Sequence, residues 1–194
     1  SMKKLFSIMA AVMTFTAVSA QNKWTLDASH SNVKFSVTHL VVSDVEGSFK
    51  MFNGDVTSKD DSFQDAVINF TVDVSSINTD DADRDKHLLA DDFFNAEKYP
   101  KMVFKSTSFK KVSGNKYKLT GNLTIRDVTK AVTFDVTFGG VVKDPWGNTK
   151  AGLKATSKIN RSEYKLNWNK ILEGGGAVVS DEVSITINAE LKKN

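Results

Sequence analysis

Residues 132–138, with the sequence VTFDVTF, carry the pattern that decides the fold. Val132, Phe134, Val136 and Phe138 alternate one by one with polar residues. Because successive side chains of a β-strand point to opposite faces, this segment is predicted to be a strand with one apolar and one wet face. A parallel sheet covered on both sides would instead show continuous apolar runs, so the pattern favours an antiparallel sheet.

The same alternation recurs along the chain. It predicts strands at residues 33–38, 45–51, 68–74, 117–126, 153–159 and 183–191, a less regular strand at 102–112 and a short strand near Trp24. About eight long strands, each with one apolar face, must avoid open edges that invite aggregation. The pattern therefore predicts an all-β sandwich or a closed antiparallel β-barrel, and it does not separate the two.

One segment, residues 79–90, reads as a helix. Asp80, Asp81 and Asp83 lie near its start, while Lys86 and His87 lie near its end. This distribution complements the helix dipole. The chain is thus predicted to form one domain, residues 21–194, of about eight strands and one short helix.

The first twenty residues are predicted to be an export signal. Lys3 and Lys4 precede an uncharged stretch up to residue 20, where Val18 and Ala20 supply the small residues of a cleavage site. Ser1, ahead of Met2, is interpreted as a cloning scar. We expect an exported protein, in the periplasm or secreted, without a membrane-spanning segment after cleavage.

Composition excludes several classes of protein. The chain has 194 residues and no Cys, which rules out disulfides, thiolate metal sites and a cysteine nucleophile. Loss of the predicted signal leaves 24 basic against 23 acidic residues, a net charge of +1. A near-neutral chain argues against nucleic acid as a partner, since such proteins present a basic surface.

The inward positions of the strands are candidates for an apolar ligand site. An eight-stranded barrel is either just filled by its side chains or holds one small ligand, and the pattern leaves both open. The predicted lining residues are Phe35, Val37, Phe49, Phe70, Val72, Leu123, Phe134, Val136, Ile185 and Ile187.

Polar candidates at the mouth of the barrel are fewer. His39 shares its parity with Phe35 and Val37, so it could meet a ligand headgroup or end its strand on backbone groups. Arg84, Arg126 and Arg161 are the three arginines of residues 21–194. Arginine favours fixed ion pairs, so these three predict either a headgroup clamp or structural pairing, for instance of Arg84 or Arg126 with a nearby aspartate such as Asp85 or Asp127. Trp146 and Trp168 lie in loop-like segments and could guard the barrel mouth.

The sequence gives less support for a metal site or a catalytic site than for an apolar ligand site. His30 and His39 are an odd number of positions apart, which on a regular strand sends them to opposite faces, so no metal or cofactor is expected. Asp27, His30 and Ser31 do not suit a hydrolytic triad, because adjacent residues of an extended strand diverge. An acid–base pair inside the barrel would have to use His39 and Tyr117.

An ordered set of short segments lies between and along the strands: DASHS at 27–31, VKFSVTHL at 33–40, VEGSF at 45–49, RDKHL at 84–88, DFF at 92–94, KYP at 98–100, FKS at 104–106, GNLTIR at 121–126 with VT at 128–129, WG at 146–147 with AG at 151–152, NRS at 160–162 and DEV at 181–183. In this order the segments resemble the YceI-like family of bacterial periplasmic polyisoprenoid-binding proteins. Asp127 and Lys165 depart from the family pattern, which has Gly at both places.

The resemblance implies a lipocalin-like barrel with an elongated apolar cavity. It also implies binding, carriage or storage of an isoprenoid or another long-chain amphiphile, without catalysis. Two alternatives stay open at this stage: a filled barrel acting as a surface interaction module, and a lipid-modifying enzyme. The sequence also leaves open whether the barrel forms a homodimer.

Overall fold

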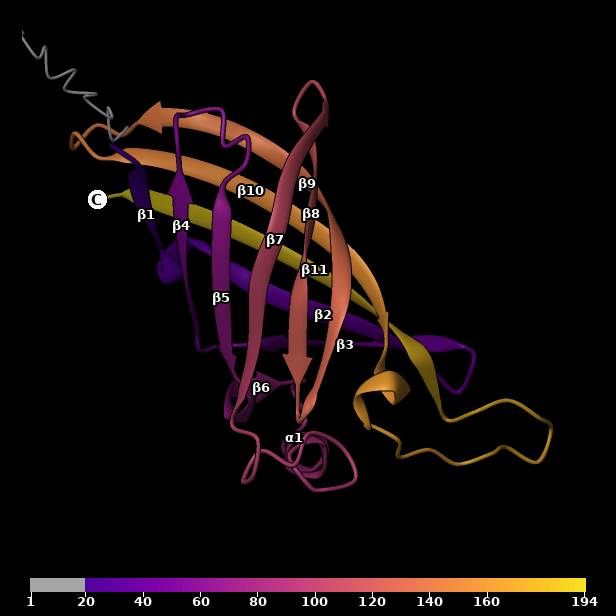
Figure 1. Cartoon of the computed structure of the whole chain (residues 1–194). Coiled ribbons are helices and arrows are strands. Elements are labelled where there is room, and N and C mark those ends of the chain that lie inside the picture. Colours follow the sequence, from indigo (N-terminus) through magenta and orange to yellow (C-terminus); the bar gives the residue numbers. More distant parts are fainter. Residues whose placement is uncertain (1–19) are drawn as a thin grey trace, which may run out of the picture.

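The computed structural model describes residues 20–194, which fold into a closed antiparallel β-barrel with one α-helix (Figure 1). The predicted export signal lies outside the described residues, apart from Ala20. The elements are β1 (Asn22–Leu26), η1 (Ala28–His30), β2 (Asn32–His39), β3 (Ser43–Phe49), β4 (Phe52–Ser58), β5 (Val67–Asp73), η2 (Val74–Ser76), β6 (Ile77–Asn78), α1 (Ala82–Leu88), β7 (Lys101–Ser113), β8 (Lys116–Ile125), β9 (Val128–Lys143), β10 (Thr149–Asn160), η3 (Arg161–Tyr164) and β11 (Val179–Lys193).

Eight strands close the barrel in the order β1-β4-β5-β7-β8-β9-β10-β11, and β1 pairs with β11 to complete it. This confirms the predicted barrel of about eight antiparallel strands and excludes the open sandwich. Strands β2, β3 and β6 extend the sheet beyond β11. None of the described helices has the length and apolar character needed to cross a membrane.

The two ends of the barrel differ. The helix end carries α1, η3 and the connections at 40–42, 126–127 and 161–178. The turn end carries the connections at 59–66, 114–115 and 144–148, together with the C-terminus (Figure 1). These names are used for the two ends below.

Strand β11 closes the barrel by pairing with three strands. One of its edges pairs with β10 from Asn160 to Lys150. Its other edge pairs with β2 between Val179 and Asn188 and with β1 between Leu191 and Lys193. β1 and β2 pair with the same edge of β11, and the chain leaves the regular strand conformation at η1 between them. Other contacts must therefore hold the η1 segment next to β11.

A polar cluster holds this corner. The Asp27 carboxylate accepts from the Ser29 backbone N–H at 3.2 Å and lies 2.8 Å from the Lys150 ammonium. Lys150 also lies 3.0 Å from Glu190 of β11. The Ser31 hydroxyl donates to the Asp27 carbonyl and accepts from the Glu190 N–H. The corner thereby replaces the ladder bonds that an unbroken strand would form.

The irregular strand predicted at 102–112 is β7. Met102 and Phe104 face the core at even positions, whereas Phe109 faces it at an odd position. The register with β8 shifts between Ser106 and Ser108, which marks a β-bulge. A bulge inserts one residue and reverses the parity, so the simple alternation fails there.

Helix α1 is shorter than predicted. It begins after Asp81, whose side chain caps it by accepting from the Arg84 N–H at 2.9 Å. Thr79, placed inside the predicted helix, is instead tied to Asp85 through its N–H and its hydroxyl. Asp83 lies in the first turn and His87 in the last, as the helix dipole favours.

An aromatic plug seals the turn end. Trp24 packs against Phe63, which packs against Phe138, with centroid distances of 4.9 Å in both pairs. Tyr117 stacks on Phe109 at 4.8 Å and donates its hydroxyl proton to the backbone carbonyl of residue 62 at 2.8 Å. The connection at 59–66 folds inward to supply Phe63, which is completely buried.

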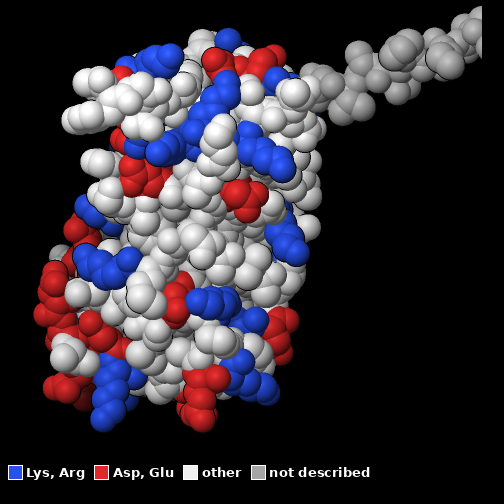
Figure 2. Space-filling view, turned by 90° about the vertical axis from the view of Figure 1, so that its left-hand side faces the viewer, with Lys and Arg blue, Asp and Glu red and all other residues white. Residues whose placement is uncertain are grey.

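The outer face mixes both signs of charge. Figure 2 shows Lys and Arg interspersed with Asp and Glu on one side of the molecule, around a band of uncharged residues. Nucleic-acid binding proteins gather Lys and Arg on one face or stripe. The face shown has no such stripe.

We predict that Lys150→Met destabilises the barrel, lowering Tm by roughly 2–4 °C. The Lys150 ammonium and the Ser29 hydroxyl hold the pKa of Asp27 well below its ordinary 3.8. A depressed carboxyl pKa stabilises the fold above the unfolded pKa, and this contribution is lost as the pH falls towards the folded pKa. The stability difference between parent and variant should therefore shrink below about pH 4.

Thermal unfolding followed by circular dichroism at several pH values measures this. Lys192→Met is the matched control, because Lys192 of β11 is exposed, pairs in register with Lys150 of β10 and has no ion pair among the described residues. A difference that stays constant from pH 7 to pH 3 would contradict the role given to the Asp27–Lys150 pair.

Candidate functional site

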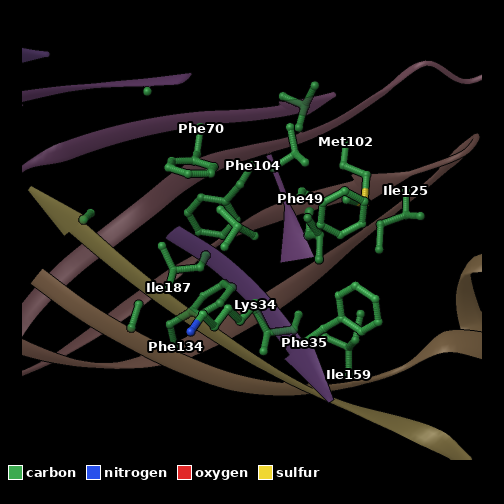
Figure 3. Close-up of a pocket in the computed structure, with 18 of the residues that line it drawn as sticks. Lys34, Phe35, Phe49, Phe70, Met102, Phe104, Ile125, Phe134, Ile159 and Ile187 are labelled. Atoms are coloured by element: carbon green, nitrogen blue, oxygen red, sulfur yellow. The ribbon is translucent and has the colours of Figure 1, made fainter. Parts of the chain in front are cut away.

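The barrel encloses an apolar cavity of about 220 Å³ (Figure 3). All ten residues predicted as lining border it: Phe35, Val37, Phe49, Phe70, Val72, Leu123, Phe134, Val136, Ile185 and Ile187. Alternation alone placed them on the inner face. Whether they contact a ligand stays a prediction.

The barrel is hollow rather than filled. Val72, Phe134 and Val136 are buried, but Ile185 and Ile187 on β11 are only half-buried although they face inward. In a filled barrel all of these side chains would be packed on every side. The open space therefore lies inside the barrel, and half-buried residues of β11 and β2 form part of its wall.

Few polar residues border the cavity. Lys34 and Asp55 occupy outward positions of β2 and β4 and are exposed. Asn69 donates to Asp55 through its amide at 3.2 Å. Arg161 is the remaining charged residue at the cavity, and its donors are already used, as described below. Water inside a cavity needs two to four polar partners, which this lining does not offer, so the space suits a hydrocarbon chain.

A close glycine–phenylalanine contact shapes one wall. Gly47 on β3 lies directly opposite Phe35 on β2. A Cβ atom at Gly47 would lie 2.3 Å from Phe35 Cζ and 2.9 Å from Thr79 Cγ2. The phenyl ring therefore lies over the glycine, where a larger residue would push it away. This placement keeps the ring beside the wall.

The cavity reaches the helix end, where residues outside the predicted set line it. Leu88 of α1, Phe94 after it and Leu166 after η3 all border the space. Phe104 and Met102 of β7 do so as well. Strand alternation could not find the first three, because they lie in irregular segments, and the bulge in β7 obscured the other two. The pairs of adjacent apolar residues at 88–89 and 93–94 were the available signal.

Arg161 has a structural role: it binds backbone carbonyls of the segment between η3 and β11 and of the start of β11. Its guanidinium donates to the carbonyls of Leu166, Trp168, Val179 and Ser180, at 2.6, 2.9, 3.2 and 2.9 Å. The side chain is buried, which lowers the pKa of the guanidinium, while Asp181 at 3.6 Å opposes that shift. Four of its five N–H donors thus fasten the connection at 165–180, and few are left for a headgroup.

Arg84 is also committed locally. It donates to the Thr79 hydroxyl at 2.8 Å and to the Thr79 carbonyl at 2.7 Å. Its contact with Asp81 is longer, 3.8 Å. The aspartate that the sequence suggested as a partner, Asp85, contacts Thr79 instead. Arg84 does not border the cavity.

Arg126 joins three backbone segments. One guanidinium nitrogen contacts the carbonyls of Asp91, Phe93 and Lys165 at 2.8–3.0 Å. Its Nε is buried without a hydrogen-bond partner among the described residues. The guanidinium lies 5.6 Å from the Tyr99 ring centroid.

The two departures from the family pattern meet in space. The Lys165 ammonium lies 2.8 Å from the Asp127 carboxylate and lowers its pKa. Lys165 has φ +64°, in the left-handed region that favours glycine. Arg126, rather than Asp127, adopts the positive φ of the β8–β9 turn, at +55°. The two substitutions therefore form one ion pair that links this turn to the end of η3.

His39 and the tryptophans lie at different places. His39 ends β2 at the helix end, half-buried and paired in register with Val179. Trp168 packs against His87 and Phe93 at the same end, with centroid distances of 5.2 and 5.6 Å. Trp146 is exposed in the β9–β10 turn at the opposite end, so the structure does not bring it to the cavity that Trp168 approaches.

The cluster around Asp27 lacks the geometry of a catalytic triad. Residues 28–30 form a 3₁₀ turn rather than the extended strand that the sequence suggested. His30 Nδ1 contacts both Ser29 Oγ at 3.1 Å and Asp27 Oδ2 at 3.0 Å. A triad base must use its two ring nitrogens for the two partners.

The same cluster is the candidate metal site among the described residues. Ligand atoms of Asp27, His30 and Glu190 lie within 4.8 Å of one another. The Lys150 ammonium already lies between the two carboxylates and supplies their counter-charge. The group therefore behaves as a structural ion cluster.

We predict that Gly47→Ala destabilises the protein by about 1–3 kcal/mol, because the added methyl displaces the Phe35 ring into the cavity. Uptake of an apolar fluorescent probe such as a parinaric acid ester should fall as well. Urea unfolding and probe titration measure the two effects. Gly152→Ala is the control, since a Cβ there meets nothing within 4 Å. Equal behaviour of the two variants would contradict the steric argument.

We predict that Arg161→Lys destabilises by about 2–4 kcal/mol, because one ammonium cannot satisfy four carbonyls spread along the connection. Urea unfolding measures this, with the half-exposed Arg84→Lys as the milder comparison. A variant that keeps parent stability but loses a bound amphiphile would instead identify Arg161 as a headgroup clamp.

Proteins of known sequence and structure resemble this chain over most of its length. The sequence is 39% identical over 168 residues to the UPF0312 protein SAB2563 of Staphylococcus aureus strain bovine RF122, covering 86% of this chain and 95% of that protein. The crystal structure of the Campylobacter jejuni YceI protein is similar with a TM-score of 0.70 and 33% identity, over 81% of this chain and 90% of that one.

A more distant structure shares the fold. It is titled a polyisoprenoid binding domain from Saccharophagus degradans, with a TM-score of 0.64 and 14% identity, over 88% of this chain and 98% of that one. The sequence profile of the YceI-like domain matches residues 24–191, nearly the whole barrel. The chain therefore belongs to the YceI-like family.

Proposed function

We propose that this protein binds one long-chain apolar molecule, a polyisoprenoid or a similar lipid, inside the barrel and carries or stores it without chemical change. The observation that carries the proposal is the apolar cavity that stays open within a closed barrel. Its inward side chains are almost all hydrocarbon, and its one buried charge, Arg161, is neutralised locally.

The energetics favour a hydrocarbon ligand. An engineered dry apolar cavity of about 150 Å³ already takes up benzene. Each methylene transferred from water contributes about 0.8 kcal/mol. Ten such groups contribute roughly 8 kcal/mol, which is comparable with the cost of association and leaves a net gain for a longer chain. A flexible chain suits a cavity that is bordered by strands all around the barrel and reaches the helix end.

Recognition of a headgroup is proposed to be secondary. Arg161 gives four donors to backbone carbonyls, Arg126 contacts three carbonyls through one nitrogen, and Arg84 donates to the hydroxyl and the carbonyl of Thr79. His39 and Trp168 lie at the helix end, where a polar terminus of the ligand would emerge. Selectivity would therefore come mainly from chain shape and apolar character.

A binding role is favoured over catalysis. The acid–base pair considered from the sequence, His39 and Tyr117, is divided between the two ends of the barrel. Tyr117 belongs to the aromatic plug, with its hydroxyl bound to a backbone carbonyl. General acid–base catalysis needs both groups within hydrogen-bond reach of one substrate.

The family supports the proposal in general terms. The Saccharophagus degradans domain that shares this architecture is named for polyisoprenoid binding. We further propose that residues 1–20 direct export, so that the barrel acts in the periplasm or outside the cell.

We predict that Ala155→Phe abolishes ligand retention and raises thermal stability, because the ring fills the cavity that Ala155 borders. Native mass spectrometry of the gently purified protein should show a bound amphiphile on the parent and none on the variant. Solvent extraction followed by mass spectrometry then identifies the released molecule.

Ala131→Phe is the matched control, because Ala131 faces outward on β9 and is exposed. If overpacking at residue 155 prevents folding, Ala155→Leu makes the same test with a smaller side chain. Retention of ligand by a folded, cavity-filled variant would place the binding site elsewhere and overturn the proposal.

A further inference from the structure

Two neighbouring loops at the helix end expose branched apolar side chains. They are the β2–β3 turn at 40–42 and the connection at 169–178. Val42 is 84% exposed, Ile171 81%, Val41 67% and Leu40 39%. These four residues are called the apolar tip below. Single exposed aliphatic residues are ordinary on a protein surface. Four of them on adjoining loops form an apolar patch, and such patches mark sites of interaction with a protein, a ligand or a membrane.

The backbone holds the tip in a costly conformation. Leu40 and Val41 have φ values of +51° and +64°. Tight turns of this kind normally use Gly, Asn or Asp, and a β-branched residue there is an outlier. Strain of this sort persists where the surroundings impose it, often at functional sites. Polar turn residues would relieve the strain and the exposure together.

Contacts between the two loops fix the tip. The Leu40 N–H donates to the Val178 carbonyl at 2.8 Å. A Cβ at Gly176 would lie 3.2 Å from a Val41 methyl, so the Val41 side chain lies close to the backbone of the other loop. Ile171 forms a β-bridge with Ala177. The two loops, which lie at the same end of the molecule (Figure 1), therefore form one supported structure, and its four apolar side chains are exposed.

The tip adjoins the cavity. His39, the residue before it, pairs in register with Val179. Val179 and Val37 both line the cavity. The opposite end is closed by the aromatic plug, so an apolar path between the cavity and the surroundings leads past the tip.

Charge and size limit what could cover the tip. Segments 39–44 and 169–181 contain one basic residue, Lys170, against three acidic ones, Asp44, Glu173 and Asp181. Binding driven by an anionic surface would need clustered Lys and Arg. A stable protein interface buries about 800 Å² on each partner, more than four aliphatic side chains on a convex loop supply. Insertion into the apolar interior of a lipid bilayer requires neither clustered basic residues nor a large complementary interface.

We infer that the apolar tip inserts into the surface of a lipid bilayer and that the cavity exchanges its ligand there. This rests on the proposed function only for the exchange step, because a water-insoluble chain must come from a membrane. Insertion itself depends on the tip alone. It should be independent of anionic lipid and of salt.

The absence of Cys allows a direct test of insertion. Val42→Cys and Val142→Cys are each labelled with an environment-sensitive nitrobenzoxadiazole dye in the full chain. Val142 is also an exposed valine, 62% exposed, but lies at the turn end. Asn22, where β1 begins, lies at the turn end together with Val142, so membrane attachment through residues 1–20 would raise the response at position 142 rather than at position 42.

With phosphatidylcholine vesicles, we expect a blue shift at position 42 and quenching by lipids that carry a nitroxide on the acyl chain. Position 142 should show neither. Addition of phosphatidylglycerol or salt should leave the result unchanged. The inference is overturned by an equal response at both positions, by no response at 42, or by a response that requires anionic lipid. A blue shift at 42 without vesicles, accompanied by a dimer mass, would assign the tip to self-association instead.

A second measurement tests exchange. Val42→Asp and Val142→Asp are compared for uptake of a polyprenol from phosphatidylcholine vesicles. The rate should fall about tenfold for Val42→Asp, the equivalent of roughly one buried aliphatic side chain, and stay at the parent value for Val142→Asp. Final occupancy should be equal, because the cavity is unchanged. Parent-like rates for Val42→Asp would overturn the inference. Failure of the parent to load, with dye insertion intact, would instead remove the proposed ligand.

Discussion

Closure of the barrel along β11 is the constraint on which the rest of the structure depends. This strand pairs with β10 on one edge and with both β1 and β2 on the other. The break between β1 and β2 is tolerated because Asp27, Lys150 and Glu190 replace the missing ladder contacts. Without that corner, β1 could not reach β4 to complete the ring of eight strands. A closed ring leaves no free edge among its strands and creates an interior shielded from water.

Two packing features determine which part of the barrel interior is filled by side chains and which part stays open. At the turn end, large aromatic side chains such as Trp24 and Phe63 fill the space and exclude a ligand. In the middle, glycine opposite phenylalanine places a ring beside the wall instead of across the barrel, as at Gly47 and Phe35. The same residue classes thus close one part of the barrel and keep another open. The outcome depends on which strand and which depth each residue occupies.

The arginine side chains at the helix end stabilise the fold of the irregular connections. Buried Arg161 and half-buried Arg126 fasten irregular connections by donating to backbone carbonyls. A buried carbonyl without a donor is costly, and a guanidinium can serve several at once. Long connections at the helix end can therefore stay ordered around the cavity. Their remaining apolar residues either line it, as Leu166 does, or project outward, as Ile171 does.

The sequence by itself determined the strand alternation, the antiparallel class and the ten inward positions that border the cavity, because the period of two is a local property of the chain. It could not decide barrel against sandwich without the family resemblance, since closure depends on pairing between residues more than 150 positions apart, such as Thr25 and Lys192. Nor could it follow β7 through its bulge. Only the tertiary structure decided that the barrel is hollow, that the arginines bind carbonyls and that Asp127 meets Lys165. These facts depend on distances between segments that no local pattern records.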